Sequence, residues 1–144
     1  MLPQELLKTL PYGSEFLFAR EITEVSEKCI RGKCFFPSSH PACLGHFRDE
    51  PLLPGVIMLE GMGQIALVAH ALYLGGDPAA YTPVLHSIEA EFHLTAPADT
   101  LLMAEGEPVY FRNLTLRSKM RLFDEEGREY VTANGLLKLI PKNR

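Results

Sequence analysis

Two ionisable side chains in this sequence have the types and surroundings of an acid–base pair. His46 follows a glycine in a proline-rich stretch, and Glu60 lies fourteen positions later, inside the longest apolar segment of the chain. A neutral imidazole can accept a proton near neutral pH. A carboxyl group among apolar side chains loses hydration, which favours its protonated form, so Glu60 could donate a proton. Eliminating water beside a carbonyl group requires one base and one acid, and we therefore interpret His46 and Glu60 as candidate catalytic residues.

The enolate formed in such an elimination must also be stabilised, because imidazole is a weak base. Pro54, Gly55 and Val56 open the apolar segment. The first backbone N–H groups of a helix lack partners, and the helix dipole is positive there. Gly55 has no side chain to block an approaching carbonyl group. We therefore expect the N–H groups of Gly55 and Val56 to form an oxyanion site.

Phe47 and Gln64 are candidate substrate-binding residues because each lies beside one member of the pair. Phe47 directly follows His46, and Gln64 lies one helical turn after Glu60, on the same face of the expected helix. Structural interpretations remain open. A histidine in a loop can be a surface residue, a buried glutamate can pair with an arginine or a histidine, and Gln64 can serve only to support its neighbours.

A metal centre is a competing interpretation of the same region. Residues of metal-ligand type occur at Cys34, His40, Cys43 and His46. The spacing from Cys43 to His46 occurs in zinc sites, although a paired Cys-x-x-Cys is missing. A Cys43–His46 nucleophile pair is a further alternative. We favour the acid–base pair over both alternatives.

The segment from Pro54 to Leu74 is predicted to be one long helix. Proline suits the first turn, and Gly75-Gly76 suits the end. Its apolar residues surround the helix axis, which is typical of a helix buried in a core or in a membrane. The polar residues Glu60, Gln64 and His70 within it, and the strand-like remainder of the chain, favour a protein core over a membrane span.

The rest of the sequence is predicted to be mostly antiparallel strands. A short helix is expected over 3–10, and strands over 16–25, 28–36, 83–94, 101–111, 114–122 and 131–139. The last three are joined by short turns and should form a meander. Residues 37–54 form a long irregular segment, which is often functional in a compact domain. One helix and one sheet give an α+β domain over residues 1–144, with the sheet curved around the helix. Its open edges predict at least a dimer.

Composition restricts the function classes. The formal net charge is −4 and the calculated pI about 5.7, which argues against a nucleic-acid-binding protein. The three cysteines are an odd number and suit a reducing compartment better than a disulfide framework. No basic stretch followed by a long apolar run opens the chain, so we expect no signal peptide and a cytoplasmic location.

The stretch from Gly45 to Gln64 resembles the signature of the β-hydroxyacyl-[acyl-carrier-protein] dehydratases of the FabZ-like family. Their pattern runs G-H-F-P-x-x-P-x-x-P-G-V, then three residues, then E-x-M-x-Q, and it places His46 and Glu60 at the family's catalytic positions. Weaker resemblance covers most of the chain, including 10–20, 87–92 and 96–99. Two departures are Arg48, where the family has proline, and Tyr12, where it usually has histidine.

The resemblance implies a hotdog fold, a homodimer that could assemble into a trimer of dimers, and an acyl tunnel beside the central helix. It implies that His46 of one subunit meets Glu60 of the other, and that neither a metal nor an organic cofactor is required. It also implies dehydration of a (3R)-hydroxyacyl group on an acyl carrier protein to the trans-2-enoyl product, in fatty-acid or specialised lipid and polyene synthesis. Two alternatives are a hotdog thioesterase and a non-catalytic acyl-binding subunit.

Overall fold

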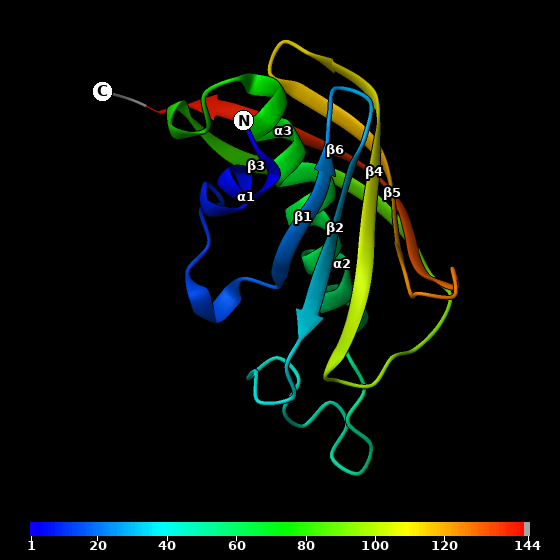
Figure 1. The fold of residues 1–144 in the computed structure, drawn as a ribbon. Helices are drawn as coiled ribbons and strands as arrows, with labels where there is room; N and C mark the ends of the chain where they lie inside the picture. The colour runs from blue at the N-terminus through cyan, green and yellow to red at the C-terminus, as the bar shows by residue number, and fades with distance from the viewer. Residues whose placement is uncertain (143–144) are drawn as a thin grey trace.

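The computed structural model describes residues 1–142, which form one six-stranded antiparallel sheet curved around a helix (Figure 1). The strands are β1 (Ala19–Val25), β2 (Ile30–Phe36), β3 (Tyr81–Phe92), β4 (Thr100–Arg112), β5 (Thr115–Phe123) and β6 (Glu129–Pro141). Their order across the sheet is β1-β2-β4-β5-β6-β3. The meander predicted for the last three strands is confirmed, since β4, β5 and β6 are sequential neighbours.

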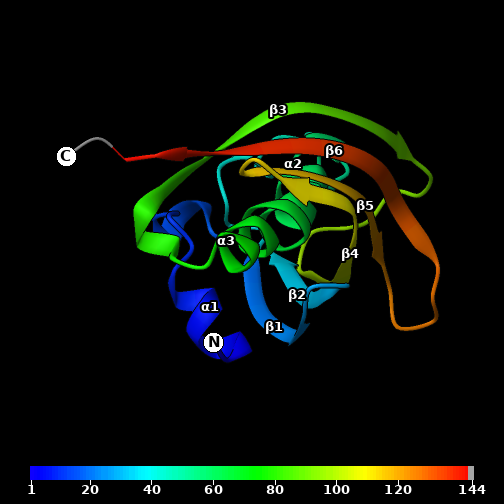
Figure 2. The ribbon, with the colours of Figure 1, turned by 90° about the horizontal axis from the view of Figure 1, so that it is seen from above.

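The central helix runs from Gly55 to Gly75 in three parts: α2 (Gly55–Gly63), a π-helical turn η2 (Gln64–Ala69) and α3 (His70–Gly75). Seen from above, it lies in the hollow of the curved sheet (Figure 2). Every residue of η2 is buried, because the sheet covers this part of the helix most closely. The sequence predicted one uninterrupted helix over 54–74. The π-helical turn is a correction, since apolar patterning does not reveal a local change of helical period.

Two glycines allow the sheet to approach the helix at η2. A β-carbon built on Gly106 of β4 would lie 3.0 Å from the carbonyl oxygen and β-carbon of Ala66. One built on Gly135 of β6 would lie 2.9 Å from a methyl group of Leu67. A side chain at Gly106 would press on the helix itself, whereas one at Gly135 would displace the side chains of Leu67 and Met120. The curvature of the sheet therefore depends on these small residues.

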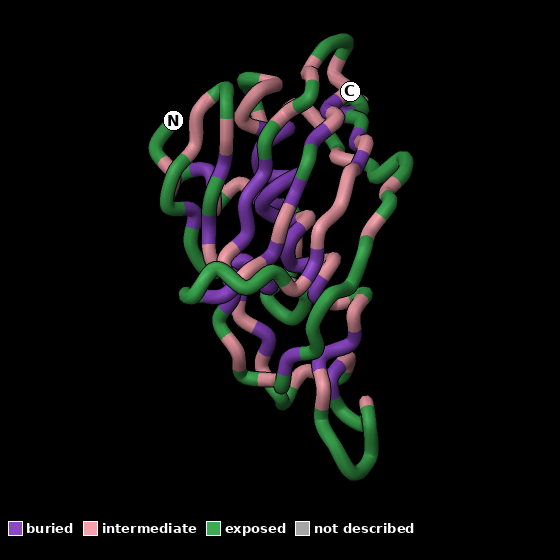
Figure 3. Tube along the Cα trace, turned by 90° about the vertical axis from the view of Figure 1, so that its right-hand side faces the viewer, coloured by how far each residue is buried: buried purple, intermediate pink, exposed green. Residues whose placement is uncertain are grey.

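The remaining segments cover the ends and flanks of the core. The short helix α1 (Pro3–Lys8) packs on β1, and two 3-10 turns, η1 (Ser14–Phe16) and η3 (Pro78–Ala80), lie in connections. Residues 37–54 form the irregular segment that the sequence predicted, and it projects beyond the sheet. Buried residues are concentrated where helix and sheet meet, whereas this segment is largely exposed (Figure 3).

Strand β3 forms one edge of the sheet and pairs only with β6. It has twelve residues, none of them fully buried, and it begins and ends two positions earlier than the strand predicted over 83–94. Val84 and Leu85 on it are 46% and 52% exposed. An exposed apolar edge of this length is an unpaired template for another strand.

The central helix is also long and apolar enough to cross a membrane, with 21 residues and a mean hydropathy of 1.5. In the structure, however, 72% of its most apolar window is buried by the chain itself. The polar residues Glu60, Gln64 and His70 lie on this helix. The position of the helix inside the sheet is that of a core element, as the sequence analysis favoured.

Candidate active site

Glu60 lies on the second turn of α2 and lines a cavity of about 180 Å³ between the helix and strands β3 and β6. The wall of this cavity is otherwise apolar except for Tyr12; it includes Val56, Leu59, Gly63, Leu67, Val68, Pro83, Leu85, Ile88 and Leu137. The shape and lining suit an acyl chain with its reactive end beside the carboxyl group. The predicted location of Glu60 beside an apolar tunnel therefore has a counterpart in the structure.

Gln64 lies directly behind Glu60, and its side chain is fully buried. Its amide oxygen accepts hydrogen bonds from the backbone N–H groups of Phe18 (2.9 Å) and Ala19 (3.2 Å). Its amide nitrogen donates to the carbonyl oxygen of Phe16 (2.9 Å) and to Oε2 of Glu60 (3.2 Å). These four bonds use the hydrogen-bonding capacity of the amide. Gln64 was expected to bind substrate; in this structure it instead anchors residues 16–19 and contacts Glu60.

Tyr12 lines the same cavity as Glu60, and the sequence analysis did not include it in the site. Its phenol lies close enough to the Glu60 carboxyl group for that group to influence its titration. The pKa of Tyr12 is raised above its usual range, mainly by burial and also by the charge of Glu60. The phenol therefore keeps its proton over the working range of an enzyme. Tyr12 is found only through the fold, since 48 positions separate it from Glu60.

His46 lies in the irregular segment and is held by Leu52. The Nδ1 atom lies 3.2 Å from the Leu52 carbonyl oxygen, and the Leu52 N–H donates to the His46 carbonyl oxygen (2.9 Å). A carbonyl oxygen can only accept, so Nδ1 carries the hydrogen and Nε2 is the basic atom of the neutral ring. The Phe47 ring stacks on the imidazole at a centroid separation of 4.3 Å. The imidazole is thus oriented, with Nε2 available to accept a proton.

Within the described part of the chain, the start of α2 leaves two backbone N–H donors without partners. The N–H groups of Gly55 and Val56 have no backbone or side-chain hydrogen-bond partner within residues 1–142. Gly55 has a packing role as well, because its β-carbon position is only 3.0 Å from the ring of Phe92 on β3. Val56 and Phe47 are exposed, at 68% and 60%.

A single chain does not place all the candidate residues together. Tyr12, Glu60 and Val56 line the cavity, whereas His46, Phe47 and Gly55 do not. The residues near the cavity mouth and along β3 include exposed apolar side chains, among them Val84 and Leu85. Leu85 also lines the cavity, so part of the cavity wall belongs to the edge strand β3.

The metal and thiol alternatives are not supported. Within residues 1–142, no three His, Cys, Asp or Glu side chains are grouped to hold a metal ion. Cys34 donates its thiol hydrogen to the Gly61 carbonyl oxygen, and burial raises the pKa of this thiol to about 12. His40 bonds to the Glu15 carbonyl oxygen and to the Ala42 N–H. Burial and the charge of Asp99 raise the pKa of Cys43, which makes it a poor nucleophile.

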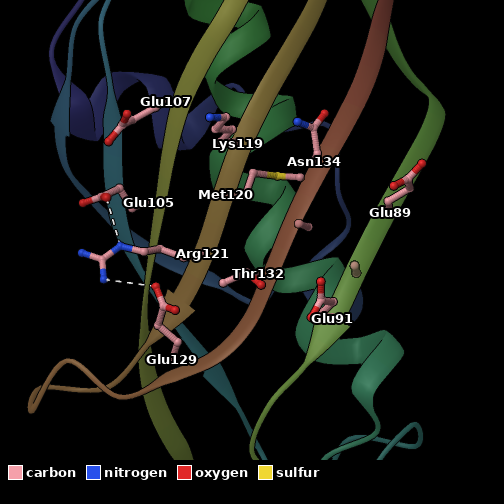
Figure 4. A pocket seen from close by; sticks show the side chains of 12 residues that line it. Glu89, Glu91, Glu105, Glu107, Lys119, Met120, Arg121, Glu129, Thr132 and Asn134 are labelled. Atoms are coloured by element: carbon pink, nitrogen blue, oxygen red, sulfur yellow. Dashed lines mark hydrogen bonds and ion pairs between the residues drawn. The ribbon is translucent and has the colours of Figure 1, made fainter.

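A larger depression, of about 540 Å³, lies on the outer face of the sheet, away from the helix (Figure 4). Five glutamates line it, and Arg121 bridges two of them: Glu105 at 3.1 Å and Glu129 at 3.7 Å. Arg31 also pairs with Glu105, at 2.7 Å. These ion pairs make Glu105 and Glu129 parts of the sheet surface, and neither Glu60 nor His46 lines this depression.

Comparison with known sequences gives a consistent family. A family model described as a FabA-like domain matches residues 10–109. A 3-hydroxyacyl-[acyl-carrier-protein] dehydratase FabZ from Thermus thermophilus is 33% identical over 132 residues, which is 90% of this chain and 91% of the relative. A FabZ from Sinorhizobium medicae is 34% identical over 103 residues, covering 63% of this chain and 67% of the relative.

Comparison with solved structures gives the same fold at low sequence identity. The dehydratase heterocomplex ApeI:P from Xenorhabdus doucetiae matches with a TM-score of 0.80 at 13% identity, covering 99% of this chain and 93% of that one. A thioesterase mutant from Pseudomonas aeruginosa matches with a TM-score of 0.72 at 15% identity, covering 99% and 96%. The hotdog arrangement predicted from the sequence is therefore confirmed.

Proposed function

The chain belongs to the FabA-like family, and we propose that it is a hydro-lyase that converts (3R)-hydroxyacyl-[acyl-carrier-protein] to trans-2-enoyl-[acyl-carrier-protein]. The FabZ relatives match nearly the whole chain, so the proposal concerns residues 1–144 as one catalytic domain; residues 143–144 lie outside the described part. The observation that carries the proposal is a carboxyl group, Glu60, at the polar end of an otherwise apolar cavity. The thioester would provide the carbonyl group beside which the proton is removed.

The proposed chemistry divides between His46 and Glu60. Nε2 of His46 takes the proton from the carbon next to the thioester carbonyl, and the electrons of that bond form an enolate. The enolate collapses to the double bond as the carbon–oxygen bond at the β-position breaks. Glu60 gives its proton to the departing hydroxyl group, which leaves as water. The hydrogen bond from Nδ1 to the Leu52 carbonyl oxygen supports the imidazole as it becomes cationic.

The oxyanion would bind at the start of α2. The unpartnered N–H groups of Gly55 and Val56 support this role, because preorganised donors stabilise charge as it develops on the carbonyl oxygen. The Phe92 ring against Gly55 fixes one side of this turn. Phe47, stacked on the imidazole, would cover the reacting carbon and exclude water.

A complete site would require two copies of the chain. Edge strand β3 leaves backbone groups and the apolar side chains of Val84 and Leu85 exposed, and pairing with the β3 strand of a second copy would cover them. In such a homodimer His46 of one subunit would reach Glu60 of the other. A trimer of dimers would be a further level of assembly.

The acyl carrier protein would be the second partner. Carriers of this kind are acidic, so docking requires basic residues near the cavity mouth. Arg48 is exposed beside His46 and Phe47, which supports it as a docking residue. Arg117 and Arg121 are instead engaged on the sheet, with Asn134 and with Glu105 and Glu129. The glutamate-lined outer depression would repel an acidic partner.

Replacement of the two catalytic candidates tests the proposal. His46→Ala and Glu60→Gln should each stay folded and lower the rate of hydration of a crotonyl thioester on the carrier protein by about a hundredfold or more. Glu27→Gln, in the exposed turn between β1 and β2, serves as the matched control for Glu60→Gln and should keep the wild-type rate. Wild-type activity in His46→Ala or Glu60→Gln would refute the assignment.

Thioester hydrolysis is the second candidate, because solved thioesterases share the fold. Product analysis separates the two activities: a dehydratase yields an enoyl thioester and a thioesterase a free acid. A cytoplasmic location is part of the proposal. It is supported by three free cysteines in residues 1–142, which suit a reducing compartment.

A further inference from the structure

The Glu60 carboxyl group has two polar neighbours from different parts of the chain. Gln64 donates to its Oε2 atom from the helix. Tyr12, in the connection between α1 and η1, lines the same cavity and lies close enough for the charge of Glu60 to raise the pKa of its phenol. Of the side chains that line this cavity within residues 1–142, only Tyr12 and Glu60 are ionisable. The ionisable side chains of the cavity are therefore a pair. Glu60 belongs to the family signature, and Tyr12 does not.

The position of Tyr12 is fixed by the same network that fixes Glu60. Its ring packs against Phe16 at a centroid separation of 6.4 Å. The Phe16 carbonyl oxygen accepts a hydrogen bond from the Gln64 amide, which also donates to Glu60. Gln64 thus holds Glu60 directly and holds Tyr12 through Phe16.

We propose that Tyr12 is a positioning residue for Glu60, and that its phenol and the Gln64 amide hold the carboxyl group from two sides. This inference rests on the proposed dehydration. With Gln64 alone, the carboxyl group would have one attachment and could turn about it. Two donors restrict that turning.

The two donors also act during proton transfer. In the acid form one carboxyl oxygen of Glu60 carries the transferable proton, while Oε2 keeps a lone pair for the Gln64 amide. When that proton passes to the departing hydroxyl group, negative charge appears on the carboxylate between the Tyr12 hydroxyl and the Gln64 amide. Donors that meet a charge as it develops lower the barrier more than they strengthen substrate binding.

The main test is Tyr12→Phe, which keeps the ring against Phe16 and removes only the hydroxyl group. We expect kcat for enoyl thioester hydration to fall about tenfold or more while KM stays within about twofold, as for loss of a hydrogen bond to a charged group. The matched control is Tyr73→Phe on α3, a half-buried tyrosine outside the cavity, which should keep the wild-type rate. A normal kcat, or a change confined to KM, would overturn the proposal.

A double variant shows whether Tyr12 acts through Glu60. In the Glu60→Gln background, Tyr12→Phe should lower the residual rate by less than about twofold. A full tenfold loss in that background would mean that Tyr12 acts independently of Glu60, and the proposal would be wrong.

A spectroscopic measurement separates this inference from the proposed activity. In the NMR spectrum of protein labelled with ¹³C-tyrosine, the Cζ signal of Tyr12 is identified as the one that disappears in the Tyr12→Phe variant. This signal should shift in Glu60→Gln and stay in place in Glu27→Gln, whose carboxyl group is exposed in a distant turn. An unchanged signal in Glu60→Gln would overturn the contact even in an active enzyme. If the signal shifts in Glu60→Gln but the wild-type protein has no dehydratase activity, the proposed dehydration is refuted and the contact between Tyr12 and Glu60 remains supported.

Discussion

The Gln64 amide nitrogen lies 3.2 Å from Oε2 of Glu60, and the remaining three hydrogen bonds of this amide go to the backbone of residues 16–19. One buried side chain thus joins the candidate acid to the segment that leads from Tyr12 into β1. The stability of that segment and the geometry of the site are physically linked at Gln64.

Gln64→Leu should therefore destabilise the fold. Leucine fills a similar volume but leaves the N–H groups of Phe18 and Ala19 and the Phe16 carbonyl oxygen without partners. The loss should be about 3 kcal/mol or more, since each unpaired buried group costs about 1–3 kcal/mol. Urea unfolding at fixed protein concentration measures it, with the exposed Gln4→Leu as the matched control. If Gln64→Leu and Gln4→Leu unfold at the same urea concentration, Gln64 does not stabilise the fold in this way.

His70 should make the fold sensitive to acid. It is fully buried on α3, its Nε2 donates to the Ser26 carbonyl oxygen at 2.8 Å, and burial lowers its pKa. The unfolded chain, where histidine has a pKa of about 6.5, then binds the proton more readily than the folded one. Stability should be complete above about pH 6.5 and fall as the pH drops below it.

His70→Gln keeps a donor for the Ser26 carbonyl oxygen but cannot titrate. The difference in unfolding free energy between pH 7.5 and pH 5.5 should be smaller in this variant than in the wild type. The exposed His86→Gln provides the comparison for a histidine without burial. If His70→Gln and the wild type lose the same stability between these pH values, His70 is not the source of acid sensitivity.

Gly106→Ala should be destabilising because the sheet has no room for a β-carbon at that point. The new carbon would lie 3.0 Å from Ala66 of η2. We expect a loss of about 1–3 kcal/mol, as for overpacking of a core. Gly63→Ala is the control, since its β-carbon would meet nothing within 4 Å and alanine favours a helix. Thermal unfolding measures the two stabilities. If Gly106→Ala has a midpoint temperature equal to or higher than that of Gly63→Ala, the close approach of β4 to the helix is contradicted.

Leu85→Glu should weaken pairing between two copies at β3. The side chain is 52% exposed in one chain and also lines the cavity, so a charge there would be buried by a partner. Sedimentation should show more monomer at a given concentration, with a parallel loss of activity. Val109→Glu is a matched control, because Val109 is equally exposed (51%) on β4, away from this edge. Unchanged assembly in Leu85→Glu would place the subunit contact elsewhere.

Local sequence patterns determined the fold class and the choice of His46 and Glu60 as the candidate acid–base pair. The helix over 55–75 follows from an apolar run between Pro54 and the Gly75-Gly76 pair, and the meander from alternating residues with short turns. His46 and Glu60 belong to one continuous signature. Such features depend on residues that are neighbours in the chain, so a sequence can reveal them.

Only the tertiary structure decided what surrounds the pair. Gln64 meets residues 45 to 48 positions away, and Tyr12 meets Glu60 across the cavity, because β1 and the segment before it pass along the helix. The folded chain also leaves His46 off the cavity that holds Glu60. These relationships depend on the register of strands and the packing of distant segments, which no local pattern specifies.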